Sequence, residues 1–409
     1  MSNFITNKKK ATIMMIFFFF VYFTSYVTRN NFGAVLEGIR QATGYSESAL
    51  GLVTTMSFIT YGVGQLISGF LGDKIQPKIL LVVGLFLSCA MNVLIPFMPS
   101  TTAMCVLWGV NGFAQAFMWP PLVKLMAGLF EKEQYDRAVV FVSWGGMIGT
   151  IVNYLVSFLF VSVLNWKFVF YFSTLIGVVM AVLLIFFCPK VSLFVRPVKK
   201  VEDLPITDKK DTKWMSLTVA VVMICIVLQG SLRDGIGTFM PTFIDQEFNL
   251  GDSISILSGV LMPILGIVSF MTASKLYAKK FKNPLICTAV IFIPATICSF
   301  ILNLQGFFGA NIGAIPTIIA MALLNGCTHG INVMLVCMVP KYFTYTGKVS
   351  LVSGILNAFT YLGSAISNFG YPLLGLGTVK VVWLATAVLA MTLCFLASKS
   401  FKKKYMDRL

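Results

Sequence analysis

The sequence predicts an all-α integral membrane protein, with twelve transmembrane helices arranged as two six-helix halves. Hydrophobic residues make up 57% of the chain and charged residues only 11%, whereas soluble domains carry about 25% charged residues. Long apolar runs recur along all 409 residues, and one long polar stretch divides them into two groups of six. These observations together exclude an ordinary soluble protein.

Twelve apolar runs are each long enough to cross a bilayer as a helix. Their expected bounds are 11–36, 47–71, 77–97, 102–130, 134–163, 168–188, 214–244, 253–278, 284–303, 312–342, 348–376 and 379–398. We therefore divide the chain into an N-terminal bundle (1–188), a solvated cytoplasmic linker (189–213) and a C-terminal bundle (214–409).

The basic residues are distributed very unevenly between the two sides of these spans. Of the 31 Lys and Arg residues, 25 fall in loops on the side of the N-terminus and 3 on the opposite side. Basic loops mark the cytoplasmic side, so both termini are expected in the cytoplasm. The net charge of +16 then faces the lipid bilayer and does not predict a nucleic-acid partner.

Other sequence features narrow the class further. The nine cysteines form no C-x-x-C pair, so neither a metal site nor a disulfide framework is expected. No phosphate-binding glycine loop and no nucleophile with a base is found, so we expect no enzyme and no cofactor. The sequence contains no Asn-x-Ser/Thr sequon and no large extracellular loop, which favours a bacterial plasma membrane. We expect a multi-pass protein that is a monomer.

Two arginines lie deep inside predicted spans, Arg29 in the first and Arg233 in the seventh. A guanidinium stays charged, and burying it at membrane depth costs roughly 2.5–3.5 kcal/mol or more. Asp234 is the one carboxylate expected at this depth, apart from Asp73 at a helix end, and helical geometry should turn it about 100° away from Arg233. These charges predict a site for a small anion, and a phosphate group suits the guanidinium fork well.

Further polar side chains are candidates for lining this site. Tyr22, Ser25 and Tyr26 fall on the helical face of Arg29. Lys124 and Gln115 lie in the fourth span, His329 and Asn332 in the tenth, and Tyr361 in the eleventh. Lys124 could equally reach the headgroups, and His329 and Tyr361 could equally be packing residues. Asp234 is a candidate for proton coupling or for a structural ion pair.

The two halves resemble one another in sequence. Arg29 and Arg233 occupy equivalent positions, and Asn111-Gly112 in the fourth span is echoed by Asn325-Gly326 in the tenth. The end of the second span, 69–74, has a weaker echo at 274–279. Parallel repeats of this kind predict a transporter whose binding site lies between the halves at the middle of the membrane, with the two arginines facing each other.

Several short motifs indicate a family. They are Gly69…Gly72-Asp73-Lys74 with Pro77-Lys78, Arg29-Asn30-Asn31-Phe32, Trp119-Pro120-Pro121 with Lys124, and Leu232-Arg233-Asp234-Gly235-Ile236 followed by Pro241-Thr242. Through them the whole chain resembles the major facilitator superfamily, and within it the organophosphate:phosphate antiporters. The resemblance implies that Arg29 and Arg233 bind a phosphoryl group and that Tyr22, Tyr26 and Tyr361 line the pathway.

The resemblance also implies a function, with some departures. A sugar or glycerol phosphate would be exchanged for inorganic phosphate by rocker-switch alternating access, and Gly69, Asp73 and Lys74 would gate the cytoplasmic side. The sequence has Asn30, Ile148 and Gly230 where relatives carry lysine, histidine and tyrosine, which leaves the organic part of the substrate open. Two alternatives remain, a membrane sensor of an external phosphorylated ligand that does not transport it, and a proton-coupled carboxylate transporter using Asp234.

Overall fold

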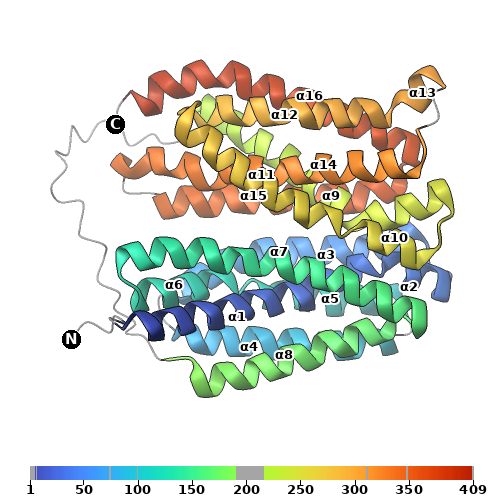
Figure 1. The fold of residues 1–409 in the computed structure, drawn as a ribbon, viewed down its shortest axis with the longest axis horizontal. Helices are drawn as coiled ribbons and strands as arrows, with labels where there is room; N and C mark the ends of the chain where they lie inside the picture. The colour runs from blue at the N-terminus through green and yellow to red at the C-terminus, as the bar shows by residue number, and fades with distance from the viewer. Residues whose placement is uncertain are drawn as a thin grey trace. The chain divides into compact units, whose positions relative to one another are not determined.

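The computed structural model describes residues 5, 7–72, 75–98, 100–189, 216–309, 312–346 and 349–407. These residues are helical with short connections, and within them no strand is found. The chain forms two compact units, 1–203 and 204–409, and each is described separately. Figure 1 labels the helices of both.

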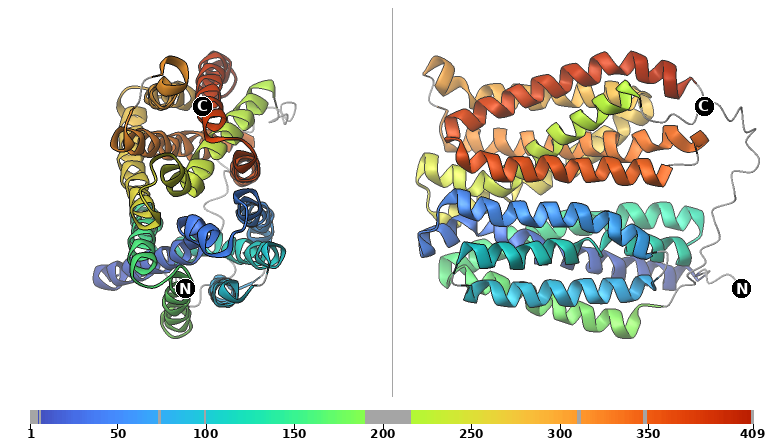
Figure 2. Two further views of the ribbon diagram at one scale, coloured as in Figure 1. Left: turned by 90° about the vertical axis from the view of Figure 1, so that its right-hand side faces the viewer. Right: turned by 180° about the vertical axis from the view of Figure 1, so that it is seen from behind.

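Unit 1 contains eight α-helices and one short 3-10 helix within the described residues. They are α1 (Lys8–Ala34), α2 (Leu36–Thr43), α3 (Glu47–Gly72), α4 (Pro77–Leu94), η1 (Ile95–Phe97), α5 (Thr101–Gln115), α6 (Trp119–Leu129), α7 (Lys132–Val163) and α8 (Lys167–Phe187). Its long helices are seen end-on in the left view of Figure 2.

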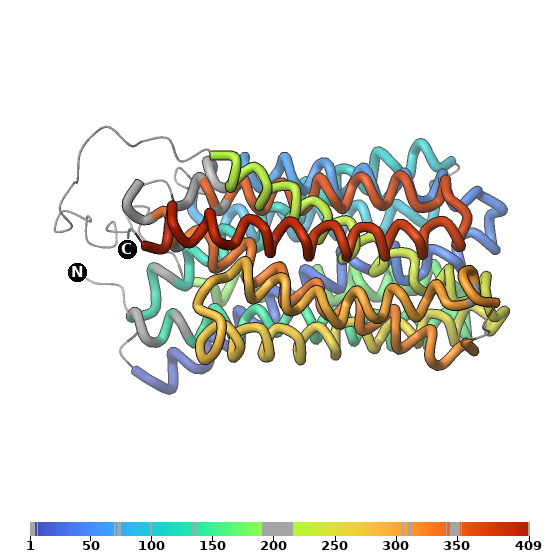
Figure 3. The backbone as a smooth tube through the Cα atoms, turned by 90° about the horizontal axis from the view of Figure 1, so that it is seen from above, coloured from blue at the N-terminus to red at the C-terminus, as the bar shows by residue number. Residues whose placement is uncertain are grey.

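Unit 2 repeats this plan with more irregular segments. Its elements are α9 (Leu217–Phe248), α10 (Asp252–Ser258), α11 (Leu261–Lys279), α12 (Pro284–Leu302), α13 (Leu304–Phe308), α14 (Ala314–Asn332), η2 (Val333–Met338), η3 (Val339–Thr346), α15 (Val349–Gly370), η4 (Tyr371–Leu373), α16 (Leu376–Phe401) and η5 (Lys402–Met406). The tube in Figure 3 shows α12 and α16 running side by side along much of their length.

The two units share one pattern of helix pairing. In unit 1, α1 packs on α7, α3 on α5 and α4 on α8. In unit 2, α9 packs on α15, α11 on α14 and α12 on α16. In both, the first span pairs with the fifth, the second with the fourth and the third with the sixth, so the repeat seen in the sequence is also a repeat of structure.

Ten helical segments among the described residues are long and apolar enough to cross a membrane. The predicted fourth span, 102–130, differs from expectation because it is not one helix. It is interrupted at 116–118, between α5 and α6. Pro120 and Pro121 lack a donor and crowd the preceding turn, so α6 begins anew with a proline in its first turn. The predicted eighth span is likewise divided into α10 and α11 by a turn at 259–260.

Glycines allow the first and fifth spans of each unit to approach closely. A Cβ on Gly145 of α7 would lie 2.5 Å from the Phe19 carbonyl oxygen of α1, and one on Gly363 of α15 would lie 2.0 Å from the Val227 carbonyl oxygen of α9. Real Cβ atoms do not come so near to backbone atoms. The arginine-bearing helix of each unit is therefore held against its partner at backbone distance.

Candidate functional site

Arg29 of α1 lies against two aromatic rings. Its guanidinium carbon is 4.4 Å from the centroid of the Tyr61 ring and 5.2 Å from that of Tyr26. An aromatic face attracts a guanidinium, by about 0.5–2 kcal/mol depending on desolvation. Tyr61 comes from α3 and was missed by the sequence reasoning, because no motif marks it and it lies on a different span.

The predicted stripe on α1 is only partly an open face. The hydroxyl oxygens of Tyr22 and Tyr26 are 3.4 Å apart, and the Tyr22 ring centroid is 4.6 Å from that of Trp119. Gly146 of α7 makes room for both tyrosines, since a Cβ there would lie 2.8 Å from the Tyr26 ring. Ser25, by contrast, is only 2% exposed and packs into the unit.

The helical turn that carries Arg29 is fixed from behind by two asparagines. Asn92 of α4 donates through Nδ2 to the carbonyl oxygen of Thr28 at 2.9 Å, and Asn111 of α5 donates to the same oxygen at 3.3 Å. Amide side chains buried in an apolar bundle are stabilised only when such bonds are made. The position of Arg29 is thus set by three helices of unit 1.

Gln115 belongs to the same polar network. Its Nε2 donates to Thr28 Oγ1 and to Ser88 Oγ, both at 2.8 Å, and the residue is 1% exposed. Gln115 was expected as a candidate substrate-binding residue. In the structure its amide supports Thr28, the residue before Arg29.

Lys124 lies on α6, one turn beyond the two prolines, and is half-buried. α6 packs against α3, α4 and α7. The helix break at 116–118 separates Lys124 on α6 from Gln115 at the end of α5.

Arg233 of α9 has a carboxylate partner. Its Nε donates to Asp234 Oδ1 at 2.8 Å and its Nη2 to Asp234 Oδ2 at 2.7 Å, so the pair is bidentate. One of the two roles expected for Asp234, a structural ion pair, is therefore present in the structure. The adjacent side chains do leave the helix in different directions, but the long arginine side chain bends back to meet the carboxylate. Both side chains are partly buried, with exposed fractions of 12% and 16%.

Side chains from two other helices complete the surroundings of this pair. Asn332 Oδ1 accepts a hydrogen bond from Arg233 Nη1 at 3.4 Å, and the Tyr361 ring centroid lies 5.8 Å from the guanidinium carbon. Ser364 of α15, one turn beyond Tyr361, donates its hydroxyl to Asp234 Oδ2. Asn332 and Tyr361 were both predicted site residues, and Ser364 was not.

His329, one turn before Asn332 on α14, packs against α11. A Cβ on Gly266 would lie 3.0 Å from the imidazole ring. His329 is also close enough to Arg233 and Asp234 to interact electrostatically with both. The structure thus brings His329, Asn332 and Tyr361 to the region around Arg233.

The equivalent asparagines of the two halves, Asn111 and Asn325, make the same kind of contact within their own units. Asn325 of α14 donates through Nδ2 to the carbonyl oxygen of Arg233 at 2.6 Å. Asn111 makes the same kind of bond to Thr28, next to Arg29. In both units an amide from the fourth span holds the arginine-bearing turn of the first.

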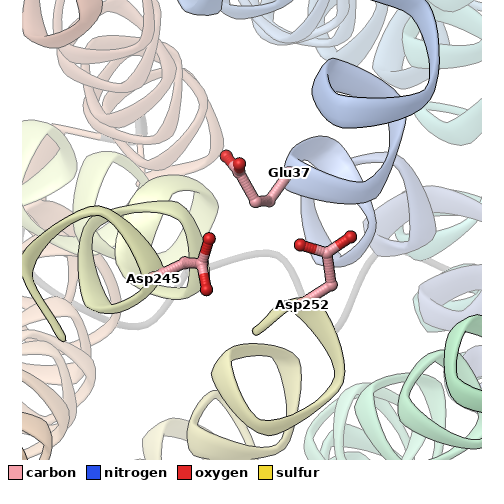
Figure 4. A group of neighbouring side chains, drawn as sticks. All are labelled: Glu37, Asp245 and Asp252. Carbon is pink, nitrogen blue, oxygen red and sulfur yellow. The ribbon is translucent and has the colours of Figure 1, made fainter. Parts of the chain in front are cut away.

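Acidic side chains are also found near the ends of α1 and α9. Helix α9 runs on to Phe248, past the predicted end at 244, so Asp245 is a further buried acid that the sequence reasoning did not count. Figure 4 shows the side chains of Asp245 and Asp252, which both belong to unit 2. Within its own unit Glu37 pairs with Arg40, and Asp245 accepts a hydrogen bond from Ser255 at 3.3 Å.

Of the three expected gating residues, Gly69 alone lies within the described residues. Asp73 and Lys74 lie outside the described residues, as does the predicted linker beyond Pro189. Gly69 lies in the last turn of α3.

The helix pairing, the internal repeat and the two partly buried arginines are consistent with the family that the chain matches. Residues 18–368 match the family model described as Major Facilitator Superfamily. The chain belongs to this superfamily. It is a multi-pass, all-α membrane protein of a transporter family.

Three relatives in this superfamily have names that concern phosphorylated compounds. The "Glycerol-3-phosphate transporter" of Bacillus subtilis is 24% identical over 92% of this chain and 88% of its own length. The "Probable hexose phosphate transport protein" of Chlamydia trachomatis is 26% identical over 28% of this chain and 25% of its own. The "Membrane sensor protein UhpC" of Escherichia coli is 31% identical over 28% of this chain and 26% of its own.

A solved structure agrees with the fold. A bacterial homologue of the human lysosomal transporter Spinster, in an inward-facing and unoccupied conformation, matches with a TM-score of 0.77. The match covers 97% of this chain and 98% of that one, at 14% identity. At this identity the likeness concerns the fold alone.

Proposed function

We propose that the protein is a secondary active transporter of a phosphate ester, a sugar or glycerol phosphate, which it carries by alternating access. The observation that carries the proposal is the pair of arginines, Arg29 and Arg233, held at equivalent places in the first helix of each unit. The name of the Bacillus subtilis relative, which aligns over 92% of this chain, supports the same substrate class.

The chemistry of the arginines favours phosphate over a simple carboxylate. A guanidinium makes two parallel hydrogen bonds to a tetrahedral oxyanion. A phosphate ester carries about −1.5 to −2 charge near neutral pH, which matches two arginines better than a single negative charge does. In this proposal both arginines hold one phosphoryl group, with Lys124 as a further cation on its route.

The organic part of the substrate would meet aromatic and polar side chains. Tyr22, Tyr26 and Tyr61 surround the Arg29 side of the site, and His329, Asn332 and Tyr361 surround the Arg233 side. Inorganic phosphate, which presents the same oxyanion, is the proposed exchange partner. Gly69, Asp73 and Lys74 are proposed to close the cytoplasmic side.

The proposed setting is the inner membrane of a bacterium, with a monomer as the working unit. Both termini are placed in the cytoplasm, because 25 basic residues fall on their side and 3 on the other.

Counterflow in proteoliposomes tests the proposal. Vesicles holding the purified protein and unlabelled glycerol 3-phosphate should take up labelled glycerol 3-phosphate, and glucose 6-phosphate or inorganic phosphate should compete with it. Vesicles without protein give the background. Competition by a dicarboxylate but by none of the phosphorylated compounds would instead indicate a carboxylate transporter.

A sensor is the second candidate, because the chain shares 31% identity over 113 residues with a protein named as a membrane sensor. Measuring transport of the ester distinguishes a transporter from a sensor. A protein whose melting temperature rises with a phosphate ester, but which shows no counterflow of that ester, would be a sensor.

A further inference from the structure

Asp234 occupies the edge of Arg233 that a phosphate group would use. The two parallel bonds from Nε and Nη2 to the carboxylate oxygens have the geometry that arginine also offers to phosphate. We propose that Asp234 is a built-in occupant of the Arg233 site, that the substrate phosphate displaces it, and that Asp234 takes up one proton when displaced. This inference rests on the proposed function and adds a coupling ion to it.

The Ser364 side chain can form a hydrogen bond with Asp234 whether the Asp234 carboxyl group is ionised or protonated. The Ser364 hydroxyl has two acceptors in reach, Asp234 Oδ2 and the carbonyl oxygen of Thr360 at 3.0 Å. A hydroxyl has one proton to donate but can accept as well. With Asp234 ionised, Ser364 donates to it. With Asp234 protonated, the carboxyl donates to Ser364 Oγ, and the Ser364 hydroxyl rotates to the Thr360 carbonyl.

The surroundings make it costly to leave Asp234 ionised once its arginine is taken. Ser364 and Thr360 are both fully buried, and the Asp234 side chain is 16% exposed. An ionised carboxylate that loses its counter-ion in such a site is strongly disfavoured and becomes neutral instead. The proton enters from the aqueous side on which the substrate binds.

The charges of the site lead to the same stoichiometry. Counting only Arg29, Arg233 and ionised Asp234, these three groups of the proposed site carry +1 when no substrate is bound. A phosphate dianion would bring this to −1, whereas a dianion together with one proton on Asp234 brings it to zero. When the substrate leaves on the far side, Asp234 returns to Arg233 and releases the proton there. The empty transporter, with its Arg233–Asp234 pair restored, can then return without phosphate, so net uptake with a proton is possible in addition to exchange.

Other charged and titratable groups lie on elements that pack against α9. On α15, Tyr361 places its ring near the guanidinium of Arg233. On α14, His329 interacts electrostatically with both members of the pair. On α16, Lys380 is ion-paired with Glu247, farther along α9. Asp234 is the group that pairs directly with the anion-binding arginine, so we assign the proton to it.

The test compares the full-length wild-type protein with Asp234→Asn in proteoliposomes. Asparagine keeps the shape of the side chain and can accept a bond from Arg233, but it cannot carry the proton. Counterflow of labelled glycerol 3-phosphate without a pH gradient is measured first, and its absence in the wild type would mean that the proposed function has failed. Net uptake is then driven by an inside-alkaline gradient at about pH 8, above the second ionisation of the ester near pH 6.

With the membrane potential clamped at zero, one proton per ester should give the wild type about tenfold accumulation per pH unit. A pH-sensitive dye inside the vesicles should report proton entry when the ester is added outside. Asp234→Asn should keep counterflow but lose both the accumulation and the proton entry. Asp252→Asn, the same chemical change elsewhere in unit 2, should behave as the wild type.

Three results would overturn the proposal while leaving the proposed function in place. One is wild-type counterflow without gradient-driven accumulation or proton entry. Another is accumulation by Asp234→Asn equal to that of the wild type. The third is a folded Asp234→Asn protein that no longer binds the ester, which would show that the charge assembles the site. Should this variant fail to fold, proton entry in the wild type decides alone.

Discussion

The two units place an arginine at the same point of their first helix but surround it differently. In unit 1, Arg29 lies against the faces of Tyr61 and Tyr26. In unit 2, Arg233 is held by a bidentate carboxylate and an asparagine. The described contacts thus differ in kind, because an aromatic ring attracts a guanidinium through its π face, whereas a carboxylate pairs with it as an ion.

The supporting framework is much more alike than these immediate contacts. Both units pair their helices in the same way, and Asn111 and Asn325 each donate to a backbone carbonyl of the arginine-bearing turn. The duplicated scaffold thus fixes where the two positive charges lie, and the neighbouring side chains decide how each charge is balanced. Four substitutions test this difference, from the largest expected effect to the smallest.

Replacing Arg29 by lysine should lower kcat/KM for phosphate-ester uptake by about 100-fold, or about 2.7 kcal/mol. Lysine keeps the charge but cannot make two parallel bonds to the phosphate. The measurement is initial uptake over a range of ester concentrations in proteoliposomes. Arg40→Lys, which changes an arginine paired with Glu37 outside the site, is the control. Uptake by Arg29→Lys at the wild-type rate would exclude Arg29 from the site.

Replacing Gly363 by alanine should destabilise the protein by about 1–3 kcal/mol, the usual cost of overpacking. The added methyl would lie 2.0 Å from the Val227 carbonyl oxygen, so α15 must move away from α9 and carry Ser364 with it. Thermal unfolding in detergent measures the change. Gly354→Ala on the same helix is the matched control, since a Cβ there meets nothing within 4 Å. Equal melting temperatures for the two variants would contradict the close crossing.

Asn30→Asp would give Arg29 the adjacent carboxylate that Arg233 already has. The ester should then bind about tenfold more weakly at pH 7.5, a loss of about 1.4 kcal/mol, because a second carboxylate must be displaced. As the pH falls, the introduced carboxyl group becomes protonated and no longer competes for Arg29. The affinity of the variant for the ester should then approach that of the wild type. Binding titrations at several pH values measure the ratio of the two affinities. Asn30→Gln is the neutral control, and a ratio that does not change with pH would show that the new carboxylate does not reach Arg29.

Tyr61→Leu should weaken ester binding about fivefold, or about 1 kcal/mol, by removing an aromatic face that orients Arg29. Tyr61→Phe keeps the ring and should stay within about twofold of the wild type. Isothermal titration of the purified variants measures both. A larger loss for phenylalanine than for leucine would mean that the hydroxyl, and not the ring, is what matters at this position.

Much of the fold was predictable because the hydropathy and charge of successive residues can be read directly from the sequence. Apolar runs located the spans, and the asparagine echo indicated a repeat that the helix pairing confirms. The break before Pro120 was visible in principle, since two consecutive prolines cannot continue a helix from the preceding turn. The break was nevertheless missed, because the apolar run of 102–130 is long enough to form one continuous helix.

The details of the candidate site were harder to predict, for two physical reasons. Tyr61 reaches Arg29 from another helix, and only tertiary packing brings them together. The position of Asp234 on a helical wheel suggested separation from Arg233, but a long side chain can bend through that angle. Gln115 was judged from its polarity alone, and its role as a support for Thr28 depends on Ser88 and on the exact packing of α4 and α5.

The interruption between α5 and α6 has a consequence for biosynthesis. At 1.5 Å per residue, the 15 residues of α5 extend about 22 Å, less than the roughly 30 Å of the hydrocarbon layer. During translation this segment is therefore a weak signal for release into lipid on its own. It gains stability once α3, which packs along it, is already in place, so the order in which the helices leave the ribosome contributes to correct insertion.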